Sequence, residues 1–149
     1  MKLRVYLDTS VFSALYDDRV ADRQGETEEF WERRDQFEIA TSELAREELE
    51  HTPDVARRAK LRQLLDCVTV HAISTEMRTL ATNYVEAGTF TALAYNDALH
   101  VAAAVLTRQD VLLSRNFKHL VNRRRRAQIN EGNISLGLPT IEIVAPPEV

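Results

Sequence analysis

The sequence is poor in cysteine, glycine and proline. Its 149 residues include one cysteine, four glycines and four prolines. The lone Cys67 excludes an internal disulfide framework and fits a reducing cytoplasm; beside Val68, it is expected to be a buried small residue. No G-x-x-x-x-G-K-[ST] pattern occurs, so a nucleotide-binding phosphate loop is excluded as well.

Long hydrophobic runs are also missing. No apolar stretch approaches the ~20 residues of a membrane span, and Lys2 leads into a short strand where a signal peptide would continue. Hydrophobic residues make up 44% and charged residues 28%, as in ordinary globular proteins. The net charge of −4 gives no whole-chain reason to bind nucleic acid or a membrane. We expect one domain spanning residues 1–149, in which any basic surface is local.

Strand-like and helix-like patterns alternate along the chain. Leu3, Val5 and Leu7 alternate with polar residues and predict a first strand. Further strands are predicted at 37–40, 68–72, 111–113 and 141–144, and helices at 11–16, 26–35, 44–51, 54–65, 75–87, 96–106 and 117–128. This order indicates the α/β class, as a three-layer α/β/α sandwich with a mainly parallel five-stranded sheet.

Polar side chains follow two of the predicted strands. Asp8 ends the first strand, and chemistry in open α/β sheets collects just beyond the carboxyl ends of strands. Thr9 and Ser10 are expected to cap the helix that follows. Ser114 and Asn116 end the fourth strand and should reach the same edge, although a turn or cap explains each of them equally well.

Glu48 interrupts the apolar face of a predicted helix. It lies between Leu44 and Leu49 on that face, where a structural helix would place a leucine, whereas Glu47 lies toward the edge. A buried unpaired carboxylate is costly, so an inward Glu48 should have a partner or a metal ion. The alternative is an acid that escapes to solvent at the helix end.

Asp97 and His100 are the only polar residues between Asn96 and Thr107. Asp97 shares a face with apolar residues of a helix that we expect to be buried on most sides. An acid in a first turn also complements the helix dipole, so position alone does not decide its role. Asn96 could cap this helix or lie in the same pocket.

Four segments, in order along the chain, carry a family resemblance. They are Leu7-Asp8-Thr9-Ser10, Glu48-Leu49 six residues after Ser42, Asp97-Ala98-Leu99-His100-Val101-Ala102, and Leu113-Ser114-Arg115-Asn116. In these segments the chain resembles PIN-domain ribonucleases, which include toxins of the VapC type from bacterial toxin–antitoxin pairs. The resemblance implies that Asp8, Glu48 and Asp97 are metal-binding acids, with Ser10 and Ser114 as polar support. These three acids and Asn116 form the predicted catalytic set.

Asn116 departs from the family pattern, which often has a fourth aspartate at this point. Its amide oxygen can orient water or bind a cation weakly, but it brings no negative charge, so a second metal ion is in doubt. Asp110 precedes the fourth strand and belongs at the opposite end of the sheet.

An oxygen-rich acidic cluster suits Mg²⁺ or Mn²⁺, which can activate water and stabilise charge on a phosphodiester. Asp8 and Asp97 are the best candidate ligands, and Glu48 binds the metal or holds its water. His100 could contact the substrate or support a metal ligand, but packing beneath the site is the favoured interpretation, because it is one residue in an apolar helix. The resemblance implies hydrolysis of single-stranded RNA to leave a 5′-phosphate, a possible small DNA-binding antitoxin as partner, and a homodimer.

One strongly basic segment follows the predicted site. Its candidate RNA contacts are Arg115, Lys118, Arg123 and Arg124, because local positive charge favours a phosphate backbone. A run of arginines is otherwise a solvated helix face.

The sequence is also compatible with other functions. The chain could be a catalytically weak PIN-like interaction module, which Asn116 favours, or a freestanding RNA-processing nuclease. A phosphoryl-accepting receiver domain would need paired acids near the first strand and a lysine late in the sheet, and the sequence has neither.

Overall fold

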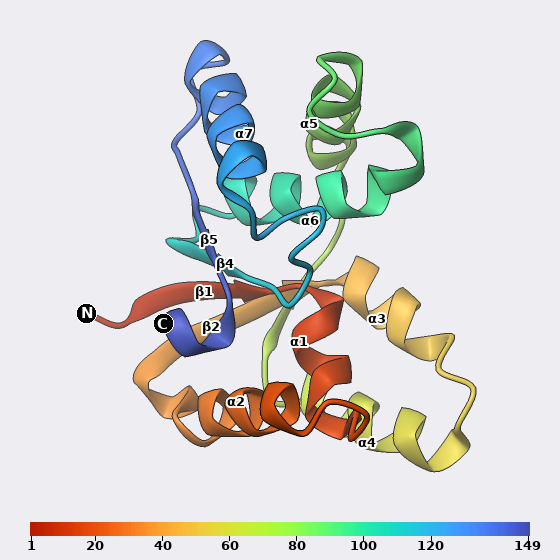
Figure 1. Cartoon of the computed structure of the whole chain (residues 1–149). Coiled ribbons are helices and arrows are strands. Elements are labelled where there is room, and N and C mark those ends of the chain that lie inside the picture. Colours follow the sequence, from red (N-terminus) through yellow and green to blue (C-terminus); the bar gives the residue numbers. More distant parts are fainter.

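The computed structural model describes all 149 residues and places a five-stranded sheet between two layers of helices (Figure 1). The strands are β1 (Leu3–Leu7), β2 (Phe37–Ser42), β3 (Thr69–His71), β4 (Val111–Leu113) and β5 (Glu142–Val144). Every neighbouring pair is parallel, and the strand order is β3-β2-β1-β4-β5. The prediction of an α/β sandwich with a mainly parallel five-stranded sheet is confirmed.

Seven α-helices surround the sheet. They are α1 (Thr9–Ser13), α2 (Ala21–Glu32), α3 (Glu43–Glu50), α4 (Val55–Leu65), α5 (Thr75–Glu86), α6 (Tyr95–Leu106) and α7 (Arg123–Ser135). Figure 1 shows α5, α6 and α7 over one face of the sheet and α1, α2 and α4 over the other. No helix combines the length and the apolar character needed to cross a lipid bilayer.

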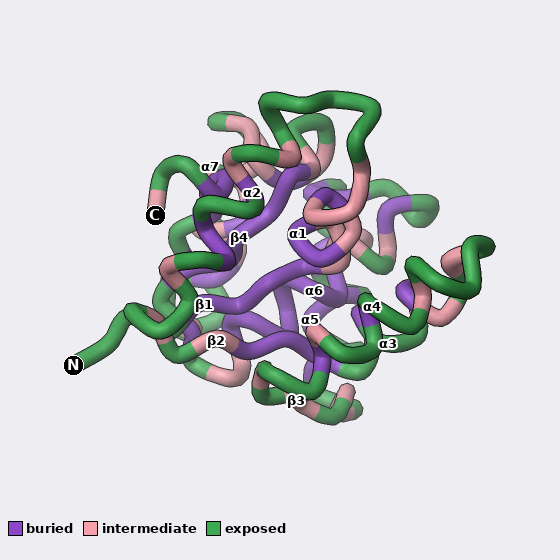
Figure 2. Tube along the Cα trace, turned by 90° about the horizontal axis from the view of Figure 1, so that it is seen from below, coloured by how far each residue is buried: buried purple, intermediate pink, exposed green.

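Each face of the sheet packs on its own core, because side chains alternate along a strand. Tyr6, Leu112 and Ile143 lie in the cluster that includes α5, α6 and α7. Val5 and Leu113 lie in the opposite cluster with residues of α1, α2 and α4. Figure 2 shows the buried path of β1 and β4 through the middle of the molecule. Full burial of each large apolar side chain contributes about 1.5–3 kcal/mol, so the central strands are fixed firmly.

Helix α6 is the most deeply placed helix, as its apolar sequence predicts. Residues 98–105 are all buried, and alanines make up Ala102–Ala104 at its centre. Small side chains let the helix approach the sheet closely. The first turn of α6, which carries Asp97, is therefore held at the carboxyl edge of the strands.

Three local predictions are wrong. Helix α2 begins at Ala21, before the predicted start at residue 26, because its start has no side-chain cap that the sequence could signal. Residues 117–122 are not helical: the main-chain oxygen of Asn116 accepts from Leu120 N, and Asn122 caps α7 by accepting from Arg125 N. Cys67 is exposed, because it lies in the turn after α4.

Candidate active site

Asp8 lies where the strand order reverses, between β1 and β4, and is 4% exposed. It is itself the N-cap of α1, a role expected of Thr9 and Ser10: its Oδ1 accepts from Ser10 N at 3.0 Å. The Ser10 hydroxyl also donates to Oδ1, and the Ser114 hydroxyl donates to Oδ2. Burial raises the pKa of Asp8, while the charge of His100 and these hydrogen bonds oppose that rise.

Both serines are fixed in turn by the backbone after β4. Arg115 N donates to Ser10 Oγ at 2.8 Å, and Asn116 N donates to Ser114 Oγ at 2.9 Å. Because each hydroxyl oxygen accepts a main-chain proton, its own proton is directed to Asp8. The structure thus brings Ser10 and Ser114 onto the carboxylate that they were predicted to support.

Glu48 reaches the same edge from α3 and faces inward. Its Oε1 accepts from Thr9 Oγ1 at 2.8 Å and from His100 Nε2 at 2.7 Å, and its side chain is 33% exposed. Burial alone would raise the pKa of Glu48, but the hydrogen bonds and charge of His100 and the Thr9 hydroxyl lower it below its ordinary value. The partner expected of an inward Glu48 is therefore His100, whereas Glu47 is exposed.

Asp97, in the first turn of α6, is the unpaired acid of the group. Its side chain makes no hydrogen bond or ion pair with the rest of the protein, and the residue is half-buried. Burial raises the pKa of Asp97, and the negative charges of Asp8 and Glu48 raise it further, against the charges of His100 and His119. The three acids predicted from the sequence therefore act on one another electrostatically at one edge of the sheet.

Asn116 takes part in a turn. Its Oδ1 accepts from His119 N at 3.0 Å, so the amide oxygen that could have faced a cation already has a partner. Asn96 is exposed within the first turn of α6 and does not cap it; the N-cap position is Ala94. Asp110 accepts from Arg4 N at 2.8 Å, at the amino end of the sheet, as expected.

Arg115 is a correction to the predicted RNA contacts. Its side chain is 6% exposed, its Nη1 lies 2.9 Å from Glu26 Oε2, and its guanidinium lies over the ring of Phe117. These contacts occupy the group that would have met a phosphate. Arg115 thus ties the end of β4 to α2.

The rest of the basic segment divides into two sets. Lys118, Arg123 and Arg124 are exposed. Arg125 packs over the ring of Phe90, and Arg126 Nη1 donates to Ile143 O at 3.0 Å. The free positive surface is therefore smaller than the run of arginines suggests.

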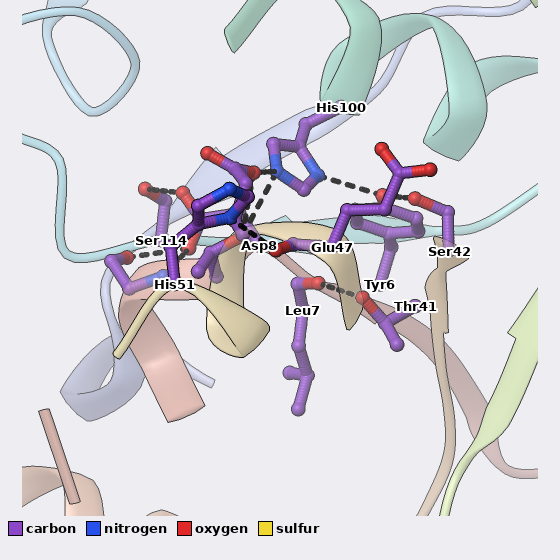
Figure 3. A network of polar contacts seen from close by, with 12 residues as sticks. Tyr6, Leu7, Asp8, Thr41, Ser42, Glu47, His51, His100 and Ser114 are labelled. Carbon is purple, nitrogen blue, oxygen red and sulfur yellow. Dashed lines mark hydrogen bonds and ion pairs between the residues drawn. The ribbon is translucent and has the colours of Figure 1, made fainter. Parts of the chain in front are cut away.

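A buried network of polar side chains lies below the acids, and the sequence did not predict it as a network. The Tyr6 hydroxyl lies between Ser42 Oγ and His100 Nδ1, as Figure 3 shows. Packing of His100 beneath the site was the favoured prediction and support of a metal ligand was an alternative, but its contacts with Tyr6 and Thr9 were not predicted. The sequence contains one indication that His100 belongs to the site: it follows Asp97 by three residues and so lies on the same face of the helix.

The acids match a hard divalent cation in chemistry. Carboxylate oxygens are the ligands that Mg²⁺ and Mn²⁺ prefer. No three His, Cys, Asp or Glu side chains are arranged in this structure to ligate one ion. The residues fit such an ion nonetheless, because the Asp97 side chain has no partner. Burial raises its pKa, and the charges of Asp8 and Glu48 add a repulsion that a cation would relieve.

Comparison with known proteins identifies the class. A family model described as the PIN domain matches residues 5–123, and the chain belongs to this family. A search of curated proteins found no match.

Among solved structures, the chain is similar to VapC20 of Mycobacterium tuberculosis, described as a sarcin-ricin loop cleaving toxin, with 16% identity and a TM-score of 0.63 over 77% of this chain and 92% of that one. DNA-bound VapBC from Salmonella typhimurium matches with 15% identity and a TM-score of 0.61, over 97% and 98% of the two chains. FitAcB from Neisseria gonorrhoeae matches with 10% identity and a TM-score of 0.63, over 97% and 99%. At these identities the likeness shows the fold.

Proposed function

We propose that the protein is a Mg²⁺- or Mn²⁺-dependent endoribonuclease and the cytoplasmic toxin of a type II toxin–antitoxin pair. The observation that carries the proposal is Asp97, a half-buried carboxylate without a partner at the carboxyl edge of the sheet, whose pKa is raised by burial and also by the charges of Asp8 and Glu48. Membership of the PIN domain family supports nuclease chemistry. The fold likeness to VapC toxins supports the toxin assignment.

Each residue has a defined part in this proposal. Asp8 and Asp97 would hold the cation, and Glu48 would hold the cation or a water beside it. When bound, the cation activates water and stabilises charge on the phosphodiester. Ser10 and Ser114 keep the Asp8 carboxylate in place through their hydroxyl protons.

RNA and an antitoxin are the proposed partners. The exposed Lys118, Arg123 and Arg124 would contact the phosphate backbone of RNA. The Salmonella structure is described as DNA-bound VapBC, which supports a small DNA-binding antitoxin for this chain. A homodimer is proposed on the family resemblance alone.

Two alternatives remain, and cleavage of RNA tests the first of them. A catalytically weak interaction module is favoured by Asn116, whose amide oxygen is occupied by His119 N. A freestanding RNA-processing nuclease would cleave RNA but would have no antitoxin that inhibits it.

The deciding experiment is cleavage of labelled RNA with Mg²⁺, Mn²⁺ or EDTA, comparing wild type with Asp8→Asn, Asp97→Asn and the exposed control Glu47→Gln. Asn is chosen at position 8 because Ala would also remove the α1 cap. We expect metal-dependent cleavage that both Asn variants lower by about 100-fold or more and that Glu47→Gln leaves intact. Wild-type cleavage by both Asn variants would overturn the site, and no cleavage by wild type would favour the interaction module.

A further inference from the structure

A chain of buried polar groups runs from β2 to the acidic edge. Ser42 Oγ lies 2.7 Å from the Tyr6 hydroxyl, which lies 2.8 Å from His100 Nδ1 (Figure 3). On the other side of the ring, His100 Nε2 lies 2.7 Å from Glu48 Oε1. Tyr6 and Ser42 are 0% exposed and His100 is 2% exposed, so solvent does not compete for these contacts.

The partners determine where the protons lie. Glu48 Oε1 accepts the Thr9 hydroxyl proton and lies 2.7 Å from His100 Nε2, and a carboxylate oxygen only accepts hydrogen bonds. His100 Nε2 must therefore carry a proton and donate it to Glu48. Burial raises the pKa of Tyr6, so its hydroxyl keeps its proton and links Ser42 Oγ with His100 Nδ1. Every polar group along the chain then has a partner, as a buried network requires.

The contacts also divide the two oxygens of Glu48. Oε1 accepts from both Thr9 Oγ1 and His100 Nε2, which uses the two lone-pair directions of a carboxylate oxygen. Oε2 accepts no hydrogen bond from any group of the protein. One oxygen is thus held by the protein, and the other is left for the partially exposed edge of the site.

From this geometry we propose that His100, braced by Tyr6, is a positioning residue that fixes Glu48 through Oε1 and presents Oε2 alone to the cation or its water. The proposal rests on the proposed nuclease function, because it gives the orientation of one of its acids. The proposal gives a function to His100 and Tyr6. Leucine and phenylalanine at these two positions would fill the core without loss of packing volume.

These contacts preorganise the Glu48 carboxylate. A glutamate has three rotatable side-chain bonds, and a carboxylate held by two donors loses that freedom before substrate arrives. Loss of an outer hydrogen bond that orients a metal ligand costs about 10–100-fold in metal affinity or activity. His100 is buried in α6 and Tyr6 is buried in β1, so the support comes from rigid elements.

The test compares His100→Leu, His100→Gln and Tyr6→Phe with wild type. Leu fills the space without a donor, and the Gln side-chain amide restores a donor near the position of Nε2. We expect His100→Leu to lower kcat for RNA cleavage by about 10–100-fold with KM for RNA within about twofold, and His100→Gln to recover most of the loss. The kcat of Tyr6→Phe should lie between those of His100→Leu and His100→Gln. This variant keeps the hydrogen bond between His100 and Glu48 but loses the Tyr6 hydroxyl that contacts His100 Nδ1.

Two further readouts do not depend on turnover. Long-range ¹H–¹⁵N spectra of the metal-free protein should show a protonated, hydrogen-bonded Nε2 on one histidine, absent in His100→Gln and shifted in Glu48→Gln. Mn²⁺ titration without RNA should give a Kd about 10–100-fold weaker for His100→Leu.

Val105→Ala is the matched control, because Val105 is buried in α6 outside the polar chain. It lowers stability and should leave kcat and Mn²⁺ affinity unchanged. Wild-type kcat and Mn²⁺ affinity in His100→Leu, or a free Nε2 in the spectra, would overturn the proposal. Absence of cleavage by wild type, with the Nε2–Glu48 bond still seen in the spectra, would instead count against the nuclease function.

Discussion

At the scale of single residues, the acids of the site have environments that move their pKa values in opposite directions. The pKa of Glu48 is lowered by His100 and Thr9, whereas burial raises the pKa of Asp8 and of Asp97. Opposed shifts among neighbouring titratable groups are typical of functional sites, where stability is given up for chemistry. Unlike Asp8 and Glu48, Asp97 has no side-chain donor in the protein that offsets its charge.

Asp97→Asn should therefore stabilise the metal-free protein at pH 7, by about 0.5–2 kcal/mol. A carboxyl whose pKa is raised on folding favours the folded state at low pH, and that contribution is lost as pH rises through the folded-state pKa. The gain should accordingly shrink toward acid pH, where Asp97 is protonated in both states. Urea unfolding across pH measures it, with the exposed Asp18→Asn as control; equal stability of Asp97→Asn and wild type at pH 7 would contradict the prediction.

At the scale of elements, sequence patterns predicted what local chemistry decides and missed what distant contacts decide. Four sequence segments predicted Asp8, Glu48 and Asp97 as site residues, because an acid within a run of apolar residues can be recognised from the sequence alone. The order of the strands depends on pairing between residues far apart, and no pattern predicted it. The helix expected from residue 117 fails because Asn116 forms a turn, and the Tyr6–His100 contact joins residues 94 positions apart.

The ion pair between β4 and α2 offers a test at this scale. Glu26→Ala should leave the guanidinium of Arg115 buried without its acid, and should destabilise the protein by about 1–3 kcal/mol. Glu29→Ala removes an exposed acid from the same helix and should change stability little. Thermal or urea unfolding separates the two variants; equal stability would mean that Arg115 finds another partner.

At the scale of the whole molecule, an acidic protein presents a small basic surface beside an acidic edge. The net charge is −4, yet Lys118, Arg123 and Arg124 are exposed in the segment that follows β4 and Ser114. Attraction of RNA to such a surface is local and sensitive to salt. The buried side chain of Arg115 takes no part in it.

Replacing Lys118, Arg123 and Arg124 by Gln should weaken RNA binding across sequences and make it less dependent on salt. The slope of log K against log salt is negative, and each lost phosphate contact makes it shallower by about 1. Fluorescence anisotropy with the Asp97→Asn background measures binding without cleavage, and exposed Arg57→Gln is the control. An unchanged salt slope would place the RNA-binding surface elsewhere.

The exposed Cys67 has a practical consequence. It is the sole thiol of the chain, and it lines a surface hollow with Lys2, Phe37 and Thr69 at the amino ends of the strands, opposite the acidic edge. A maleimide dye would therefore attach at one known position and stay clear of Asp8 and Asp97. Energy transfer between proteins labelled at Cys67 can report self-association, and a labelled partner can report capture by an antitoxin, without a substitution near the chemistry.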